Sequence, residues 1–238
     1  TRCIGSGGMA TVYAGEDLAL KRPVALKFLA ERLLEQPAAV ERFMREAQVA
    51  GRLAHPNIIS IYDVCRDRRA CYMVMELVNP GSAGQHLRKT GPYYWIVATR
   101  ILVDCCAALR VAHEAGVIHR DIKPDNILFS STGVVKLADF GIVKTITDDP
   151  SLTVSGQLVG TPVYMSPEQG RDPRDVDFRS DVYSLGATYF ALLTARPPFS
   201  GSSLLEIMAN VRHEDPPDPR DFIAEIPEPC ALLIKHAL

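Results

Sequence analysis

The chain has 238 residues, of which 47% are hydrophobic and 23% charged, a globular composition that excludes a disordered or fibrous protein. The 26 Lys and Arg residues nearly balance the 28 Asp and Glu residues, so a net charge of −2 provides no strong field toward nucleic acid or an anionic membrane. No apolar run reaches the roughly 18 residues needed to span a bilayer, and the N-terminus lacks the layout of a signal peptide.

Strands dominate the first part of the chain. Apolar runs predict strands over 24–29, 58–64 and 71–78. One helix interrupts them and is expected to end before Pro56. Its apolar residues recur mostly at steps of three and four, which gives one buried stripe: Val40, Phe43, Met44, Ala47, Ala50 and Leu53.

A Gly-rich stretch, 79–84, fits neither helix nor strand, and we expect it to separate two lobes. Helices dominate after it: a 3.6-residue period covers 96–112, and 182–193 is apolar nearly all round, which predicts a buried helix. Two short strands, 127–129 and 134–137, flank a hairpin signal. The sequence therefore predicts an α+β fold with a small sheet lobe followed by a larger, mainly helical lobe.

Candidate chemistry begins near the N-terminus. Gly5, Gly7 and Gly8 leave backbone N–H groups able to approach phosphate oxygens, although a Gly-rich hairpin turn looks the same when considered alone. A strand follows these glycines, whereas a dinucleotide-binding fingerprint requires a helix there, and the Gly-Lys-Ser/Thr of a Walker A motif is absent. Lys27 lies on an apolar face of its strand, where an ammonium needs an anion, and Glu46 on the next helix is a candidate. Surface roles for both residues remain the alternative.

A polar segment, 117–128, lies between apolar flanks. Within it, Asp121 could accept a proton, Lys123 could neutralise a phosphate, and Asn126 could offer an amide oxygen to a hard cation. Asp139 follows a predicted strand and precedes a glycine by two residues, a setting that suits Mg²⁺, which takes few protein ligands. A solvated loop would carry similar residues, so each motif alone leaves the function open.

Together, the motifs resemble the signature set of the eukaryotic-type (Hanks-type) Ser/Thr protein kinase family, in its bacterial branch. In chain order they are the Gly-rich loop 5–10, Val24-Ala25-Leu26-Lys27, Glu46, His119-Arg120-Asp121 with Asn126, Asp139-Phe140-Gly141 and Ser166-Pro167-Glu168. The resemblance covers the whole chain. It implies a bilobal kinase fold, with an N-lobe over 1–78, a hinge over 79–84 and a C-lobe over 85–238, together one kinase domain.

The resemblance also implies ATP and Mg²⁺ as cofactors, and it assigns roles to individual residues. The implied catalytic residues are Asp121, Lys123, Lys27 and Glu46, with Asp121 as the base. The implied metal ligands are Asn126 and Asp139. The implied nucleotide contacts are Ile4, Gly5, Ser6, Gly7, Gly8, Met9, Ala10, Thr11, Val12, Ala25, Lys27, Met75, Glu76, Val78 and Leu128. Among these, Ile4 and Val12 would cover the adenine, and Ala25, Val78 and Leu128 would complete its apolar slot. Met75 would be the gatekeeper at the back of that slot, and Glu76 and Val78 would bond the adenine edge through their backbones.

Regulation and partners follow from the same resemblance. Thr153 and Ser155 are candidate phosphorylation sites, and Thr161 is expected to contact the catalytic aspartate. The expected partners are proteins that carry Ser or Thr, together with a kinase-domain dimer for trans-autophosphorylation, and neither nucleic acid nor a membrane segment within this chain. Six cysteines without disulfide or zinc spacing favour reduced thiols and hence a cytoplasmic location.

The two ends of the chain differ from the family pattern. Compared with that pattern, most of the first strand and the last helices are expected to be missing, and Glu168 is expected to lack the arginine that pairs with it in the family. The chain is therefore expected to be a fragment of a longer kinase. Two alternatives remain, a non-catalytic pseudokinase that binds nucleotide or docks a partner, and another type of ATP-binding enzyme. Pseudokinases usually lack at least one of Lys27, Asp121 and Asp139, and all three are present here.

Overall fold

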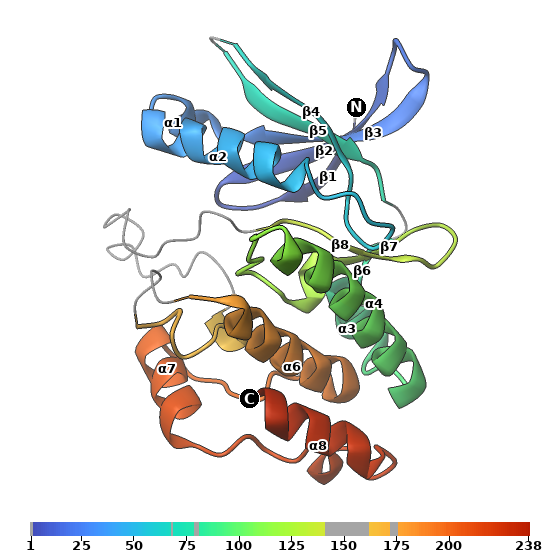
Figure 1. The fold of residues 1–238 in the computed structure, drawn as a ribbon, viewed down its shortest axis with the longest axis vertical. Helices are drawn as coiled ribbons and strands as arrows, with labels where there is room; N and C mark the ends of the chain where they lie inside the picture. The colour runs from blue at the N-terminus through green and yellow to red at the C-terminus, as the bar shows by residue number, and fades with distance from the viewer. Residues whose placement is uncertain (1, 68, 79–80, 141–161, 172–175) are drawn as a thin grey trace.

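The computed structural model describes residues 2–67, 69–78, 81–140, 162–171 and 176–238. A five-stranded antiparallel sheet lies above a larger group of helices (Figure 1). We call these parts the sheet lobe (2–78) and the helical lobe (81–238). The arrangement confirms the α+β fold expected from the sequence, with a small sheet lobe followed by a larger, mainly helical lobe.

The sheet lobe is built around strands in the order β1-β2-β3-β5-β4. Their bounds are β1 (Arg2–Ser6), β2 (Ala10–Asp17), β3 (Arg22–Leu29), β4 (Ile61–Arg66) and β5 (Cys71–Glu76). A short helix α1 (Glu31–Leu34) precedes α2 (Pro37–Ala50), which begins with proline at a position where a missing N–H costs nothing. Most of the predicted stripe of α2 packs on the sheet, with Val40 and Phe43 against Leu29 and Met73. Leu53 was expected on this helix but lies beyond its end, and it belongs with Ala50 to the core of the helical lobe.

The helical lobe contains α3 (Ala83–Thr90), α4 (Trp95–Glu114), α6 (Phe178–Thr194), α7 (Leu204–His213) and α8 (Glu228–Ala237). The described part of this lobe also contains the short 3₁₀ helices η1 (Pro124–Asn126), η2 (Pro162–Tyr164) and η4 (Pro219–Asp221). A small sheet, in the order β6 (Gly81–Ser82), β7 (Ile127–Phe129) and β8 (Val135–Leu137), lies where the two lobes meet. The predicted hairpin of β7 and β8 is present, with its turn at Gly133, whose φ is 80°.

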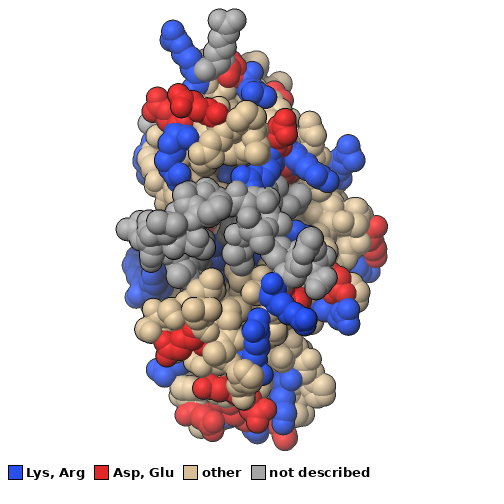
Figure 2. All heavy atoms as spheres, turned by 90° about the vertical axis from the view of Figure 1, so that its left-hand side faces the viewer, with Lys and Arg blue, Asp and Glu red and all other residues tan. Residues whose placement is uncertain are grey.

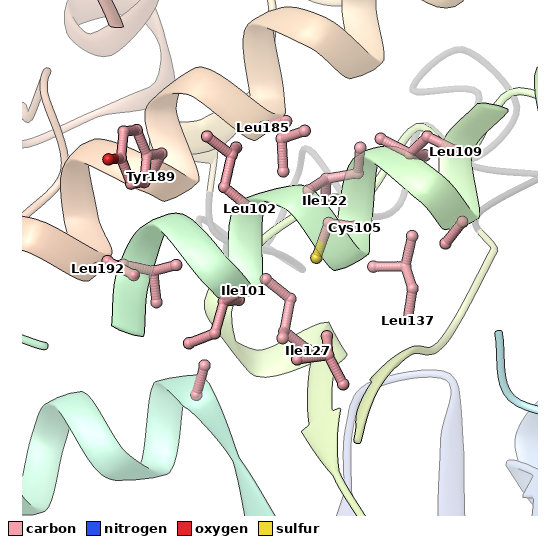
Figure 3. Close-up of a cluster of buried hydrophobic side chains, with 14 of the residues drawn as sticks. Ile101, Leu102, Cys105, Leu109, Ile122, Ile127, Leu137, Leu185, Tyr189 and Leu192 are labelled. Atoms are coloured by element: carbon pink, nitrogen blue, oxygen red, sulfur yellow. The ribbon is translucent and has the colours of Figure 1, made fainter. Parts of the chain in front are cut away.

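The main core lies between α4, α6 and the β7–β8 hairpin (Figure 3). The side chains that meet there are Ile101, Leu102, Cys105 and Leu109 of α4, Leu185, Tyr189 and Leu192 of α6, and Ile127 and Leu137 of the hairpin. Every residue of α6 from Tyr183 to Thr194 is buried, so the helix is covered as its apolar sequence predicted. Val182, the first residue of the stretch predicted to be buried, differs from this prediction because it is 45% exposed.

Two further sequence expectations were wrong at element boundaries. The Gly-rich stretch is regular from residue 81 onward, since β6 and the start of α3 occupy 81–84. A capping box overrides the weak helix propensity there: Ser82 Oγ accepts from Gln85 N (3.1 Å), and Gln85 Oε1 accepts from Ser82 N (3.2 Å). The strand expected from Ile58 begins only with β4, because Ile58 instead forms a parallel bridge with Leu137 of β8.

The surface is mixed in charge. Basic and acidic side chains are interspersed over the face shown in Figure 2, in agreement with the small net charge of −2. Among the described residues, no helix is long and apolar enough to cross a bilayer.

The core predicts a contrast between two leucines on helices. Leu192→Ala removes a side chain that is 1% exposed, and we expect a loss of about 2–5 kcal/mol in the free energy of unfolding. Leu205→Ala makes the same change at a residue that is 83% exposed, and we expect an effect within about 0.5 kcal/mol. Urea unfolding midpoints measure both effects, and equal midpoints for the two variants would contradict this packing.

Candidate active site

A lysine in the sheet lobe is held between two carboxylates from different elements. Lys27 Nζ of β3 lies 3.3 Å from Glu46 Oε1 of α2, so the ion pair expected from the sequence is present. The same atom lies 2.8 Å from Asp139 Oδ1, which follows β8. Burial alone would lower the pKa of the Lys27 ammonium, but the charges of Asp139 and Glu46 outweigh it and raise that pKa. Lys27 is therefore a fixed, fully charged cation where the lobes meet.

The polar segment after α4 gathers around Asp121. Lys123 Nζ donates to the two carboxylate oxygens of Asp121, at 3.2 and 3.0 Å. Asn126 Nδ2 donates to Asp121 Oδ2 (2.9 Å) and to the Asp121 backbone carbonyl (2.7 Å). These donors fix the direction of the carboxylate, as a proton acceptor needs. Because Nδ2 makes both bonds, the amide oxygen is the atom of Asn126 suited to a cation.

The backbone of this segment is held by a buried aspartate that sequence reasoning had not assigned. Arg120 has a φ of 65°, in the left-handed region, and its N–H donates to Asp181 Oδ1 (2.8 Å). Asp181 Oδ2 accepts from the His119 N–H (2.8 Å), and Gln169 Nε2 donates to the Arg120 carbonyl (2.9 Å). The signal available in the sequence was a carboxylate in the first turn of an otherwise apolar, buried helix.

His119 connects the segment to the residue before Asp139. Its Nδ1 accepts from the Asp121 N–H (3.2 Å), so Nε2 carries the proton and donates to the Ala138 carbonyl (3.0 Å). The ring is fully buried and lies 4.5 Å from that of Phe140. Burial lowers the pKa of His119, in keeping with this neutral tautomer.

An apolar cluster beside these polar groups contains most of the residues predicted to enclose the adenine. Ala25 and Met75 are buried there, and the partly buried residues packed against them include Val12, Val78 and Leu128. Ile4 does not belong to the cluster and is 38% exposed on β1. The glycine-rich segment forms the turn between β1 and β2, closed by a bond from Gly7 N to the Ala10 carbonyl (2.9 Å).

Some predicted positions lie outside the described residues, namely Gly141, Thr153, Ser155 and Thr161. Glu168 is described, and it accepts a hydrogen bond from Ser180 Oγ of α6. Within the described part of the chain, no ion pair joins Glu168 to an arginine.

The donor set fits a magnesium ion bound with a nucleotide. A carboxylate from Asp139 and an amide oxygen from Asn126 are hard oxygen ligands, which Mg²⁺ prefers. The described residues contain no group of three or more His, Cys, Asp and Glu side chains that could hold a metal by themselves. Mg²⁺ usually keeps few protein ligands and completes its shell with phosphate and water, so two ligands are enough.

The buried His119 predicts a dependence of stability on pH. The unfolded histidine, with a pKa near 6.5, takes up a proton below that pH, whereas folded His119 stays neutral, so acid favours unfolding. We expect the free energy of unfolding to fall by up to about 1.4 kcal/mol per pH unit below pH 6.5. In His119→Phe this contribution should vanish, and the exposed control His236→Gln should keep it. Identical slopes for His119→Phe and the unmodified protein in pH-dependent urea unfolding would contradict it.

Comparison with known proteins gives the same family as this geometry. The family model described as "Protein kinase domain" matches residues 1–238. The chain is 42% identical over 234 residues to a probable serine/threonine-protein kinase, CE0033, of Corynebacterium efficiens, covering 96% of this chain and 35% of that protein. It is 41% identical over 220 residues to the serine/threonine-protein kinase PknB of Mycobacterium leprae, covering 91% of this chain and 35% of that protein.

A third relative is the serine/threonine-protein kinase PknL of Mycobacterium tuberculosis, 41% identical over 224 residues, covering 94% of this chain and 56% of that protein. The chain thus spans 35% of the length of the first two relatives and 56% of the third. Because the family model covers every residue, the chain belongs to the protein kinase domain family.

Proposed function

We propose that this chain is the catalytic domain of a serine/threonine protein kinase, which transfers the γ-phosphoryl group of Mg·ATP to Ser and Thr hydroxyls of proteins. The observation that carries the proposal is the contact of Lys27 Nζ with both Glu46 and Asp139, at 3.3 and 2.8 Å. One buried cation thereby joins the sheet lobe to the predicted metal ligand. The names of the relatives support Ser and Thr as acceptors.

Binding is assigned to residues from both lobes. Lys27, oriented by Glu46, would hold the α- and β-phosphates, and Asn126 and Asp139 would hold Mg²⁺. Magnesium, when bound, neutralises charge on the β- and γ-phosphates. The apolar cluster around Met75 would enclose the adenine, with the backbones of Glu76 and Val78 along its edge. Ile4 of β1 would cover the adenine together with Val12. The remaining predicted contacts, Gly5 to Thr11, would cover the phosphates from the turn between β1 and β2 and from its flanks.

The transfer step is assigned to the Asp121 cluster. The Asp121 carboxylate takes the proton of the substrate hydroxyl as its oxygen attacks the γ-phosphorus. The bond from that phosphorus to the β–γ bridging oxygen breaks, and ADP leaves with the electron pair. Lys123, already within 3.2 Å of Asp121, would stabilise the charge on the transferring group. Positioning and charge neutralisation thus account for the catalysis.

The wider assignments belong to the same proposal. The lobes over 1–78 and 85–238 would close on the nucleotide about residues 79–84. The domain would act in the cytoplasm, where ATP is available and thiols stay reduced, and its six cysteines form no disulfide. A non-catalytic nucleotide-binding module is the alternative. The retention of Lys27, Asp121 and Asp139 argues against it.

Two aspartates should fail in different ways. Asp121→Asn should lower kcat by about 10²–10⁴-fold with little change in the affinity for Mg·ATP, because the carboxylate faces the hydroxyl. Asp139→Asn should instead raise the magnesium concentration needed for half-maximal activity. Asp104→Asn, which removes a charge that is paired with Arg100 within α4, is the control and should leave both quantities unchanged. Phosphate transfer from radiolabelled ATP to a protein substrate measures kcat, and full turnover in Asp121→Asn would refute the catalytic role.

The kinase should also phosphorylate itself. After incubation with Mg·ATP, mass spectrometry should find phosphate on Thr153 or Ser155, because small and acidic residues surround these hydroxyls and Arg120 could pair with the phosphate. If a dimer carries out the reaction in trans, the initial rate per molecule should rise with protein concentration. Asp121→Asn is the control and should stay unmodified. Phosphate found only outside 145–160 would contradict the assignment of these sites.

A further inference from the structure

Besides the contact of Lys27 with Asp139, a second ion pair crosses between the lobes, at the end of β5. Glu76, the last residue of β5, places its Oε2 atom 2.8 Å from Lys136 Nζ of β8. Both side chains are mostly buried, with exposed fractions of 23% for Glu76 and 13% for Lys136. None of the roles assigned above uses either side chain, since Glu76 was expected to act through its backbone.

Glu76 also fastens the loop that leads into β4. Its backbone N–H donates to the Ser60 carbonyl (2.9 Å), and the Ser60 N–H donates to Glu76 Oε2 (3.3 Å). The carboxylate oxygen that binds Lys136 therefore also accepts a backbone hydrogen bond. Glu76 is tied at once to its own lobe and to the helical lobe.

The same loop runs along β8 through backbone bonds. Leu137 N donates to the Asn57 carbonyl (2.8 Å), and Ile59 N donates to the Leu137 carbonyl (3.1 Å). The Asn57 side chain adds a bond from Nδ2 to the Val135 carbonyl (2.8 Å). Glu76 and Lys136 thus lie beside a continuous seam of hydrogen bonds between the lobes.

The positions of the two residues link this seam to the site. Glu76 follows Met75 of the apolar cluster, and Lys136 is paired across the β7–β8 hairpin with Leu128, which packs against that cluster. Lys136 also precedes Asp139 by three residues on the strand that delivers this carboxylate to Lys27. A shift of β8 relative to β5 would therefore move the adenine slot and Asp139 together.

We infer that Glu76 and Lys136 form a positioning pair that holds the adenine-binding end of β5 in register with β8, and so sets the affinity for ATP. The inference rests on the proposed kinase function. It predicts that the two charges act as a unit. Removing one leaves the other in a mostly buried site without its partner, whereas removing both leaves no unmatched charge.

A double-mutant cycle tests the coupling. Glu76→Gln keeps the shape and an oxygen acceptor for Ser60, and Lys136→Met keeps the aliphatic stem, so each change removes mainly one charge. Each single variant should raise the KM for ATP and weaken a fluorescent ATP analogue, with kcat within about twofold of the unmodified protein. The rise in KM for the double variant should be about tenfold smaller than the product of the rises for the two single variants. This ratio corresponds to a coupling free energy of about 1.4 kcal/mol.

The Arg100–Asp104 pair provides a matched control. It lies within α4, with 3.4 Å between Nε and Oδ1, and it connects no second element. Arg100→Met and Asp104→Asn should leave the KM for ATP and the analogue affinity unchanged. Hydrogen exchange at the amides of Ile59, Ser60 and Leu137 adds a measurement without nucleotide. It should speed up in both Glu76→Gln and Lys136→Met, and in neither control.

The outcomes separate the two proposals. Fully multiplicative effects in the cycle would overturn the positioning pair. So would a lower unfolding temperature accompanied by unchanged ATP affinity and unchanged exchange along the seam, because that result describes a purely structural ion pair. An unmodified protein that binds the analogue but transfers no phosphate would refute the proposed kinase activity alone, and the cycle would then be evaluated on affinity and exchange.

Discussion

A buried ammonium group cannot remain charged without anions beside it, and this requirement organises the whole molecule. Lys27 meets it with two carboxylates, one from α2 and one from the segment after β8. To place Glu46, α2 must pack its stripe on the sheet, and to place Asp139, β8 must lie beneath the same sheet. The ion pairs of this one cation thus depend both on the orientation of α2 and on the approach of the two lobes.

The helical lobe solves a related problem with the opposite charge. Asp181 is completely buried, and two backbone N–H groups of the polar segment, those of His119 and Arg120, satisfy it together with His113 Nε2 (2.7 Å). A buried carboxylate without donors would be costly, so the backbone at His119 and Arg120 is drawn into one shape. That shape includes the left-handed conformation of Arg120, which a loop without such an acceptor would rarely adopt. Asp181 of α6 therefore holds the backbone of the two residues that precede Asp121.

Local patterns predicted much of this arrangement. The periodicity of α2, α4 and the buried α6, the β7–β8 hairpin, and the roles considered for Lys27 and Glu46 were accessible because each depends on residues close in sequence. The order of motifs then indicated the family. Contacts between distant segments could not be predicted. Nothing in the sequence near Asp181 indicates that it binds the backbone of His119 and Arg120, and nothing near Lys136 indicates that it pairs with Glu76. The Gly-rich stretch was misjudged because a side-chain cap, Ser82 with Gln85, outweighed composition.

The hydrogen bonds from the polar segment to Asp181 of α6 affect the order in which the protein folds. Asp181 is separated by 62 and 61 residues from the two N–H groups that it holds, and Lys27 by 112 residues from Asp139. Closing such long loops costs entropy that only later contacts recover, so these bonds form late in folding. A chain emerging from the ribosome has its glycine turn, Lys27 and Asp121 long before it has α6. The backbone at His119 and Arg120 therefore gains the acceptor that shapes it only after α6 has been synthesised.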